Sequence, residues 1–202
     1  MPHPTVMLFD LGGVLVATHG RARLHALLPH LTDAQIQARW LESAAVDRFE
    51  RGRIAPTEFA TEFIAEWRLQ MDGAQFIESF AGWVGDFFEG AKEIVRALSN
   101  DHRVACLSNT NAVHWARLQE ANDLFDHCFV SHVMGHMKPD LAAYRHVLGA
   151  LQVKPGDVWF FDDLAPNVAA ARSLGINAFQ VEGPEGIAAA LRAAGIHARG
   201  RT

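Results

Sequence analysis

The spacing of hydrophobic residues differs between parts of the chain. Residues 5–11 form a short continuous apolar run that ends at Gly12 and Gly13, the pattern of a strand buried on both faces. From residue 18 to residue 88 the apolar positions recur at helical spacing, and no convincing strand interrupts them. This region is therefore predicted to be an all-helical insert, with helical groups around residues 24–31, 36–41, 59–67 and 76–84.

From Gly90 onward the pattern alternates between helix and strand, which is typical of a doubly wound parallel α/β sheet. We predict a Rossmann-like core built from residues 1–17 and 89–202, with the helical insert at 18–88 as a second unit. The expected helices are 91–99, 111–122, 141–151, 167–174 and 185–194, and the expected strands are 104–108, 127–131, 158–162 and 178–181.

Composition narrows the possible partners. The 202 residues carry a formal net charge of -5 with Lys and Arg scattered along the chain, so nucleic acid is not an expected partner. No apolar segment is long enough to suggest a membrane helix. Cys106 and Cys128 lie in apolar, strand-like runs, which suits buried thiols and a cytoplasmic location. We expect a monomer or a weak homodimer that acts on a small molecule.

Polar residues follow four of the predicted strands. In a doubly wound sheet the carboxyl ends of the strands meet at one edge, where ligands bind. A set of three carboxylates, a lysine and a hydroxyl offers an oxyanion nucleophile, oxygen ligands for a divalent cation and a fixed positive charge, as phosphoryl transfer requires. The residues concerned are Asp10, Ser108, Asn109, Lys138, Asp162 and Asp163.

Each of these residues also has a purely structural explanation. A single strand-end Asp is more often a turn or helix-capping residue than a nucleophile, and Ser108-Asn109 could simply begin a helix. The adjacent acids Asp162 and Asp163 are harder to explain this way, because they would repel each other without a cation or hydrogen-bond donors. The convergence of all four positions favours a catalytic site.

The segments FDLGGVLV, LSNTN, GHMKPD and FFDDLAPNVAAARSLG resemble the four motifs of the haloacid dehalogenase superfamily, in the same order across nearly the whole chain. The helical insert is similar to the small helical cap of that superfamily. Together with FERGRIAPTEF in the insert, the motifs are most similar to the branch that includes bacterial α-glucose-1-phosphate phosphatases.

The resemblance implies a Mg²⁺-dependent phosphatase in which Asp10 attacks phosphorus to form an aspartyl-phosphate. It implies that Lys138 neutralises charge, and that Ser108 and the backbone amide of Asn109 hold the phosphate oxygens. The implied ligands of Mg²⁺ are Asp10, the backbone carbonyl of Gly12, Asp163 and, through water, Asp162, with Asn167 in a supporting position.

Many phosphatases of this superfamily carry an acid two residues after the nucleophile, where this chain has Gly12. General acid-base assistance is worth about 10² to 10⁴ in rate, so we expect a preference for activated monoesters such as glucose 1-phosphate. A hydroxyl of the substrate, a water or a cap residue could also supply the proton.

Other interpretations remain open at this stage. A 2-haloacid dehalogenase also uses a strand-end Asp without a following acid, and it needs no metal; the pair Asp162-Asp163 favours phosphoryl chemistry instead. A non-catalytic protein that binds a phosphometabolite is another alternative. A response-regulator receiver fits less well, because its paired acids lie near the chain start.

Overall fold

The computed structural model describes residues 4–196 and contains a parallel five-stranded sheet with the order β5-β4-β1-β6-β7. The central strand β1 pairs with β4 on one side and β6 on the other, so the sheet winds outward in both directions from it. The prediction of a doubly wound parallel sheet is confirmed. Its strands are β1 (Val6–Phe9), β4 (Arg103–Ser108), β5 (His127–Val130), β6 (Val158–Asp162) and β7 (Asn177–Gln180).

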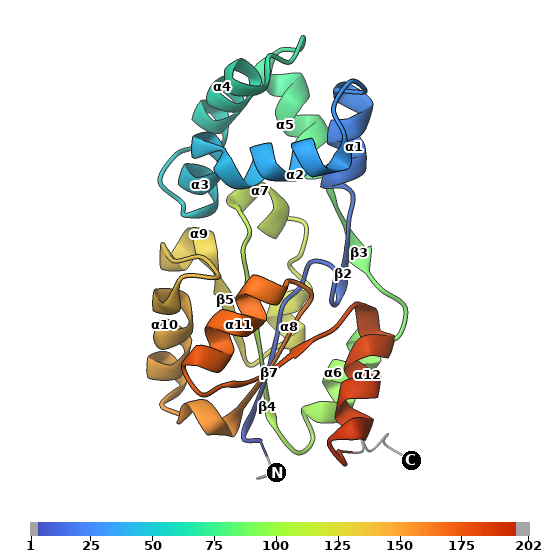
Figure 1. Ribbon diagram of the computed structural model, residues 1–202, viewed down its shortest axis with the longest axis vertical. Coiled ribbons are helices and arrows are strands. Elements are labelled where there is room, and N and C mark those ends of the chain that lie inside the picture. Colours follow the sequence, from blue (N-terminus) through green and yellow to red (C-terminus); the bar gives the residue numbers. More distant parts are fainter. Residues whose placement is uncertain (1–3, 197–202) are drawn as a thin grey trace.

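Helices cover both faces of the sheet (Figure 1). One face packs against α6, α8 and α12 around Phe9, Cys106 and Phe161, and the other packs against α10 and α11 around Leu8 and Phe160. Burial of both faces explains why the strand sequences are almost continuously apolar. The core helices are α6 (Ala91–Leu98), α7 (Ala112–Trp115), α8 (Ala121–Leu124), α9 (Ser131–Met134), α10 (Leu141–Leu151), α11 (Ala165–Ser173) and α12 (Gly183–Ala193), with a 3₁₀ turn at Pro155–Asp157.

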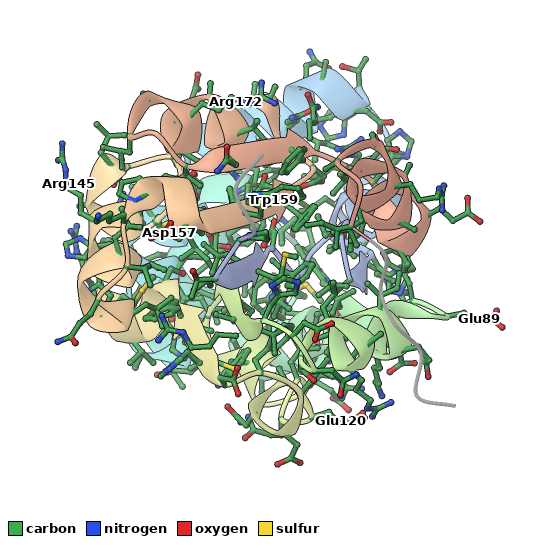
Figure 2. All side chains as sticks on the ribbon, turned by 90° about the horizontal axis from the view of Figure 1, so that it is seen from below. Glu89, Glu120, Arg145, Asp157, Trp159 and Arg172 are labelled. Atoms are coloured by element: carbon green, nitrogen blue, oxygen red, sulfur yellow. The ribbon has the colours of Figure 1, made fainter. Side chains whose placement is uncertain are left out.

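Figure 2 views the molecule from the end opposite the helical insert. Trp159 of β6 lies in the interior, whereas Glu89, Glu120 and Arg145 point outward into solvent. In the described residues, no helix is both long and apolar enough to cross a bilayer.

The helical insert sits above the carboxyl edge of the sheet (Figure 1). Its own apolar core is rich in aromatic rings, including Phe59, Phe63 and Phe76, which pack against one another at centroid distances of 5.1–5.8 Å. The insert helices are α1 (Gly20–Leu27), α2 (Asp33–Glu42), α3 (Ala44–Glu50), α4 (Pro56–Trp67) and α5 (Gly73–Ala81). We call these five helices the cap.

Two short strands connect the cap to the sheet. β2 (Val16–Thr18) and β3 (Val84–Phe87) pair antiparallel, with an irregular register between Val16 and Thr18. The expectation of no strand between residues 18 and 88 was therefore wrong at β3. Four residues with a central Gly85-Asp86 carry too little apolar alternation to be recognised. The division of the chain at residues 17 and 88 remains a prediction.

Two helices also differ from the expectation. The predicted helix 111–122 is divided into α7 and α8, and the chain turns between them so that Leu118 and Ala121 can enter the core. Helix α3 was not expected, because it has only seven residues. Its start is fixed by Ser43, whose side-chain oxygen accepts a hydrogen bond from the Val46 amide.

Candidate active site

The carboxyl ends of β1, β4 and β6 form the floor of the site. Asp10 directly follows β1, and its amide continues the sheet ladder by donating to the Phe161 carbonyl at 2.9 Å. Ser108 and Asp162 are the last residues of β4 and β6, the two strands that flank β1. Because the three strands are adjacent and parallel, their terminal side chains share one edge, as expected from the sequence.

Lys138 joins two carboxylates at this edge. Its ammonium nitrogen lies 2.8 Å from Asp10 Oδ1 and 2.7 Å from Asp162 Oδ2. All three side chains are buried, with residue exposures of 8% for Asp10, 3% for Lys138 and 0% for Asp162. Burial lowers the pKa of Lys138, but the two carboxylates outweigh this and the net shift is upward. The lysine is therefore a fixed positive charge within the site.

The two oxygens of Asp10 have different surroundings. Oδ1 accepts hydrogen bonds from the Leu11 amide at 2.7 Å and from Lys138. Oδ2 accepts none from any residue in the described part of the chain. Burial raises the pKa of Asp10 to about 7, an effect that Lys138 opposes. The arrangement holds one oxygen in place and leaves the other available to attack a substrate.

Asp162 is held by donors on both of its oxygens. Oδ1 accepts from the Leu164 amide at 2.9 Å and from Asn167 Nδ2 at 2.9 Å, while Oδ2 accepts from Lys138 and from Asn167 Nδ2 at 3.1 Å. The backbone carbonyl of Asn167 in turn accepts the Tyr144 hydroxyl. Asn167 thus supports Asp162, and Asp162 anchors Lys138. A role of Asp162 toward metal-bound water remains a prediction.

Asn109 fixes the backbone of Lys138. Its side-chain amide donates to the Lys138 carbonyl at 2.8 Å and accepts from the Lys138 amide at 2.8 Å. The sequence analysis assigned only the backbone amide of Asn109 to the site, so this contact was missed. Ser108 is buried at the end of β4. Phosphate binding by Ser108 and the Asn109 amide remains a prediction.

Three carboxylates converge where the metal was expected. Asp10, Asp162 and Asp163 each place an oxygen within 4.8 Å of the others. The pKa of Asp163 is raised mainly by burial and secondly by the charge of Asp162. Asp10 and Asp162 are buried and Asp163 is partly buried. Since such closely spaced carboxylates repel one another and all-oxygen ligands suit Mg²⁺, the residues fit a divalent cation.

Gly13 makes room for this carboxylate group. Its φ of +73° lies in the left-handed region, and a Cβ placed on it would be 2.5 Å from Asp163 Oδ2. Gly12 has no such restriction: a Cβ there would meet only the Thr18 methyl, at 3.2 Å. The metal-ligand role expected of the Gly12 carbonyl is not tested by these contacts.

A cap residue, Glu50, also lies near the site and was missed by the sequence analysis. It is the last residue of α3 and is partly buried. Burial raises its pKa to about 7, and the charges of Asp47 and Asp10 add to that rise, while Arg51 and Lys138 oppose it. The capping residue Ser43 could have revealed the helix, but no sequence signal indicates which way Glu50 points.

Comparison with known proteins settles the family. Residues 4–175 match the family of haloacid dehalogenase-like hydrolases. The chain belongs to this family. Together with named phosphatase relatives, the match identifies a hydrolase of the phosphatase type.

Two relatives of this haloacid dehalogenase-like hydrolase match over most of their length. A sesquiterpene phosphatase of Aspergillus oryzae is 28% identical over 179 residues, covering 84% of this chain and 85% of that protein. A D-ribitol-5-phosphate phosphatase of Bacteroides thetaiotaomicron is 26% identical over 192 residues, covering 87% and 91% respectively. The two names specify different substrates, so the relatives indicate the reaction more closely than the substrate.

Solved structures share the fold of this haloacid dehalogenase-like hydrolase. A HAD family enzyme from Bacteroides thetaiotaomicron superposes with a TM-score of 0.78 at 20% identity, covering 94% of this chain and 99% of that one. The same enzyme in complex with magnesium and inorganic phosphate gives 0.73 at 21% identity, covering 89% and 94%. An L-2-haloacid dehalogenase from Xanthobacter autotrophicus gives 0.63 at 19% identity, covering 98% and 90%.

Proposed function

We propose that this hydrolase is a Mg²⁺-dependent phosphatase that acts on small phosphate monoesters, among them sugar phosphates such as glucose 1-phosphate. The observation that carries the proposal is the Asp10–Lys138–Asp162 arrangement, in which Asp10 Oδ2 accepts no hydrogen bond from residues 4–196. A buried cation beside a buried nucleophilic carboxylate suits an anionic phosphoryl group, whose charge the lysine partly neutralises.

In this proposal Asp10 Oδ2 attacks phosphorus, and the bond from phosphorus to the leaving oxygen breaks. Lys138 stays protonated and stabilises the equatorial oxygens, while Ser108 and the Asn109 amide donate to them. Bound Mg²⁺ would supply additional neutralisation of phosphate charge. Water then releases phosphate from the aspartyl-phosphate and regenerates Asp10.

The carboxylate group favours phosphoryl transfer over dehalogenation. A dehalogenase needs no divalent cation: its reaction would use Asp10 as the nucleophile but not a cation held by the converging carboxylates of Asp10, Asp162 and Asp163. The cofactor we propose is therefore Mg²⁺, and the partner is a small phosphorylated metabolite. Cys106 and Cys128 are free thiols, which supports a cytoplasmic location.

A phosphate-release screen over sugar phosphates, polyol phosphates and p-nitrophenyl phosphate tests the function. We expect release that depends on Mg²⁺ and stops with a chelator, and a loss of at least about 10³-fold in Asp10→Asn. Asp123→Asn, which removes an exposed acid, serves as the matched control.

Halide release from 2-haloacids in the presence of chelator would instead identify a dehalogenase. Unchanged phosphate release by Asp10→Asn would contradict a covalent mechanism on this residue.

A further inference from the structure

The motif that supplies the nucleophile supplies no proton donor. Gly12 occupies the second position after Asp10 and has no side chain to protonate a leaving oxygen. Asp162 is occupied by Lys138 and Asn167, and Asp163 belongs to the carboxylate group that suits a metal. A further acid is therefore needed for esters of ordinary alcohols, whose alkoxides leave poorly without a proton.

Glu50 reaches the site from the cap. It ends α3, the cap helix that contacts α9 of the core, and the charges of Asp10 and Lys138 both act on its carboxyl group. Asp47 of the same helix and Arg51, which follows Glu50, also act on this carboxyl group, and Arg51 pairs with Asp140 in the segment that follows Lys138.

The end of α3 is held firmly against the core. Arg51 donates to Asp47 at 2.7 Å and to Asp140 at 2.8 Å, so it links the cap to the loop that carries Lys138. Gly52 approaches α9 so closely that a Cβ there would lie 2.0 Å from the His132 carbonyl oxygen. Both contacts are made by the two residues that directly follow Glu50, so they fix where its side chain begins.

The Glu50 carboxyl group is available for chemistry. Among residues 4–196 it accepts no hydrogen bond, and the nearby Arg51 already has two other carboxylate partners. On the core side the charges of Asp10 and Lys138 act on it, and in the adjacent helix α9 burial lowers the pKa of His132. The residue is only partly buried.

A carboxylate with only a structural role would be expected to have a hydrogen-bond or ion-pair partner. Structural carboxylates at the end of a helix normally accept a hydrogen bond or join an ion pair, as Asp47 does with Arg51. Glu50 does neither. Its pKa, raised by burial to about 7, leaves both protonation states populated near neutral pH, as a group that alternates between acid and base requires.

We propose that Glu50 is the general acid and base of this enzyme, taking the place left empty by Gly12. The inference depends on the proposed phosphatase function and extends it, because it adds esters of ordinary, poorly leaving alcohols to the substrate range.

The proton balance follows from the two half-reactions. In the first, Asp10 Oδ2 bonds to phosphorus, the bond from phosphorus to the ester oxygen breaks, and Glu50 gives its proton to that oxygen. In the second, Glu50 takes a proton from a water whose oxygen attacks phosphorus, and the bond from phosphorus to Asp10 breaks. Alcohol and inorganic phosphate leave, and both carboxyl groups return to their initial states.

The experiment compares leaving groups. We would measure kcat/KM and kcat with Mg²⁺ for glycerol 1-phosphate, glucose 1-phosphate and p-nitrophenyl phosphate, using wild type, Glu50→Gln and Glu50→Asp. Glu42→Gln removes an exposed acid from the neighbouring helix α2 and is the matched control. Circular dichroism and thermal unfolding establish that each variant is folded.

We expect Glu50→Gln to lower kcat/KM by about 10² to 10⁴ for glycerol 1-phosphate and by less than about 10-fold for p-nitrophenyl phosphate. The loss for glucose 1-phosphate should lie between these. With p-nitrophenyl phosphate, Glu50→Gln should also show a burst of p-nitrophenol, because hydrolysis of the aspartyl-phosphate loses its base. Glu50→Asp should retain part of the rate.

An equal loss for all three esters, or no loss, would overturn the role of Glu50 while leaving the phosphatase assignment in place. A folded wild type that releases phosphate from none of the esters would overturn the proposed function and this inference with it.

Discussion

The side-chain amide of Asn109 bonds both backbone polar groups of Lys138, donating to its carbonyl and accepting from its amide at 2.8 Å each. The loop that carries Lys138 is thereby tied to the end of β4. With its backbone fixed, Lys138 has fewer conformations in which its ammonium group does not contact Asp10 and Asp162. Asn109 positions Lys138 from outside the reacting atoms.

We therefore expect Asn109→Ala to lower kcat/KM by roughly 10²-fold, because a small displacement of a catalytic group is costly. If Asn109 acts through Lys138, the double variant Asn109→Ala/Lys138→Ala should be no slower than Lys138→Ala alone. Asn122→Ala, at an exposed position, is the control. Additive losses in the double variant would show that Asn109 acts independently of the lysine.

Gly13 is expected to be essential for metal binding. Gly13→Ala would place a methyl group 2.5 Å from Asp163 Oδ2 and force this carboxylate aside. Gly90→Ala is a matched control, because Gly90 has a similar φ of +78° but no atom within 4 Å of an added Cβ. In both variants an alanine at positive φ should lower the free energy of unfolding by about 1–2 kcal/mol. Only Gly13→Ala should also weaken Mg²⁺ binding, by at least about 10-fold.

Calorimetric titration with Mg²⁺ and urea unfolding separate the two effects. Equal Mg²⁺ affinity in Gly13→Ala and Gly90→Ala would contradict a metal site that includes Asp163.

A carboxyl group introduced at position 12 tests whether proton donation is what Glu50→Gln removes. Among residues 4–196, a Cβ added at this position meets only the Thr18 methyl group, at 3.2 Å, and φ is not restrictive there, so we expect Gly12→Asp to fold. In the Glu50→Gln background we expect Gly12→Asp to raise kcat/KM for glycerol 1-phosphate by about 10-fold or more. Gly12→Asn, with the same size but no transferable proton, should give no gain. A gain with Asn equal to that with Asp would point to packing instead of proton transfer.

The sheet and its motifs were readable from the sequence because each leaves a local signal. Strand β6 is a continuous apolar run that ends in two acids, and burial on both faces requires that pattern. The convergence of Asp10, Ser108 and Asp162 then follows from the parallel order of the strands.

The missed features depend on contacts between distant segments. Glu50 is brought to the core by the contacts that Gly52 and Arg51 make with it, and neither contact has a periodic signature. The hydrogen bonds between the Asn109 side chain and the Lys138 backbone join residues that are 29 positions apart, so they likewise leave no local sequence signal. Strand β3 is too short, and too polar at its centre, to be distinguished from a loop.

His114 should make the junction between cap and core sensitive to acid. Its Nε2 lies 2.9 Å from the Phe80 carbonyl of the cap, which can only accept, so this nitrogen carries the proton. Nδ1 is then left to accept from Asn111 Nδ2 at 3.1 Å, because Asn111 Oδ1 already accepts the His114 amide. A second proton, on Nδ1 of His114, would point at the Nδ2 donor of Asn111.

Burial lowers the pKa of His114 to about 4, although the bond to Phe80 opposes the shift. A histidine with a lowered pKa contributes stability above its ordinary value of 6.5, and this contribution is lost as pH falls from 6.5 toward 4. The loss should reach about 1.4 kcal/mol per pH unit at most. His114→Gln keeps an N–H donor but does not titrate, so its unfolding free energy should change less over this range.

Urea unfolding at pH 7, 5.5 and 4.5 measures the difference, with His25→Gln as the exposed control. Hydrogen exchange should show that protection is lost first at α5 and α7, the two helices that His114 joins. If wild type and His114→Gln lose stability in parallel as the pH falls, the buried histidine does not control the junction. Such a result would assign the acid sensitivity to the carboxylates of the site instead.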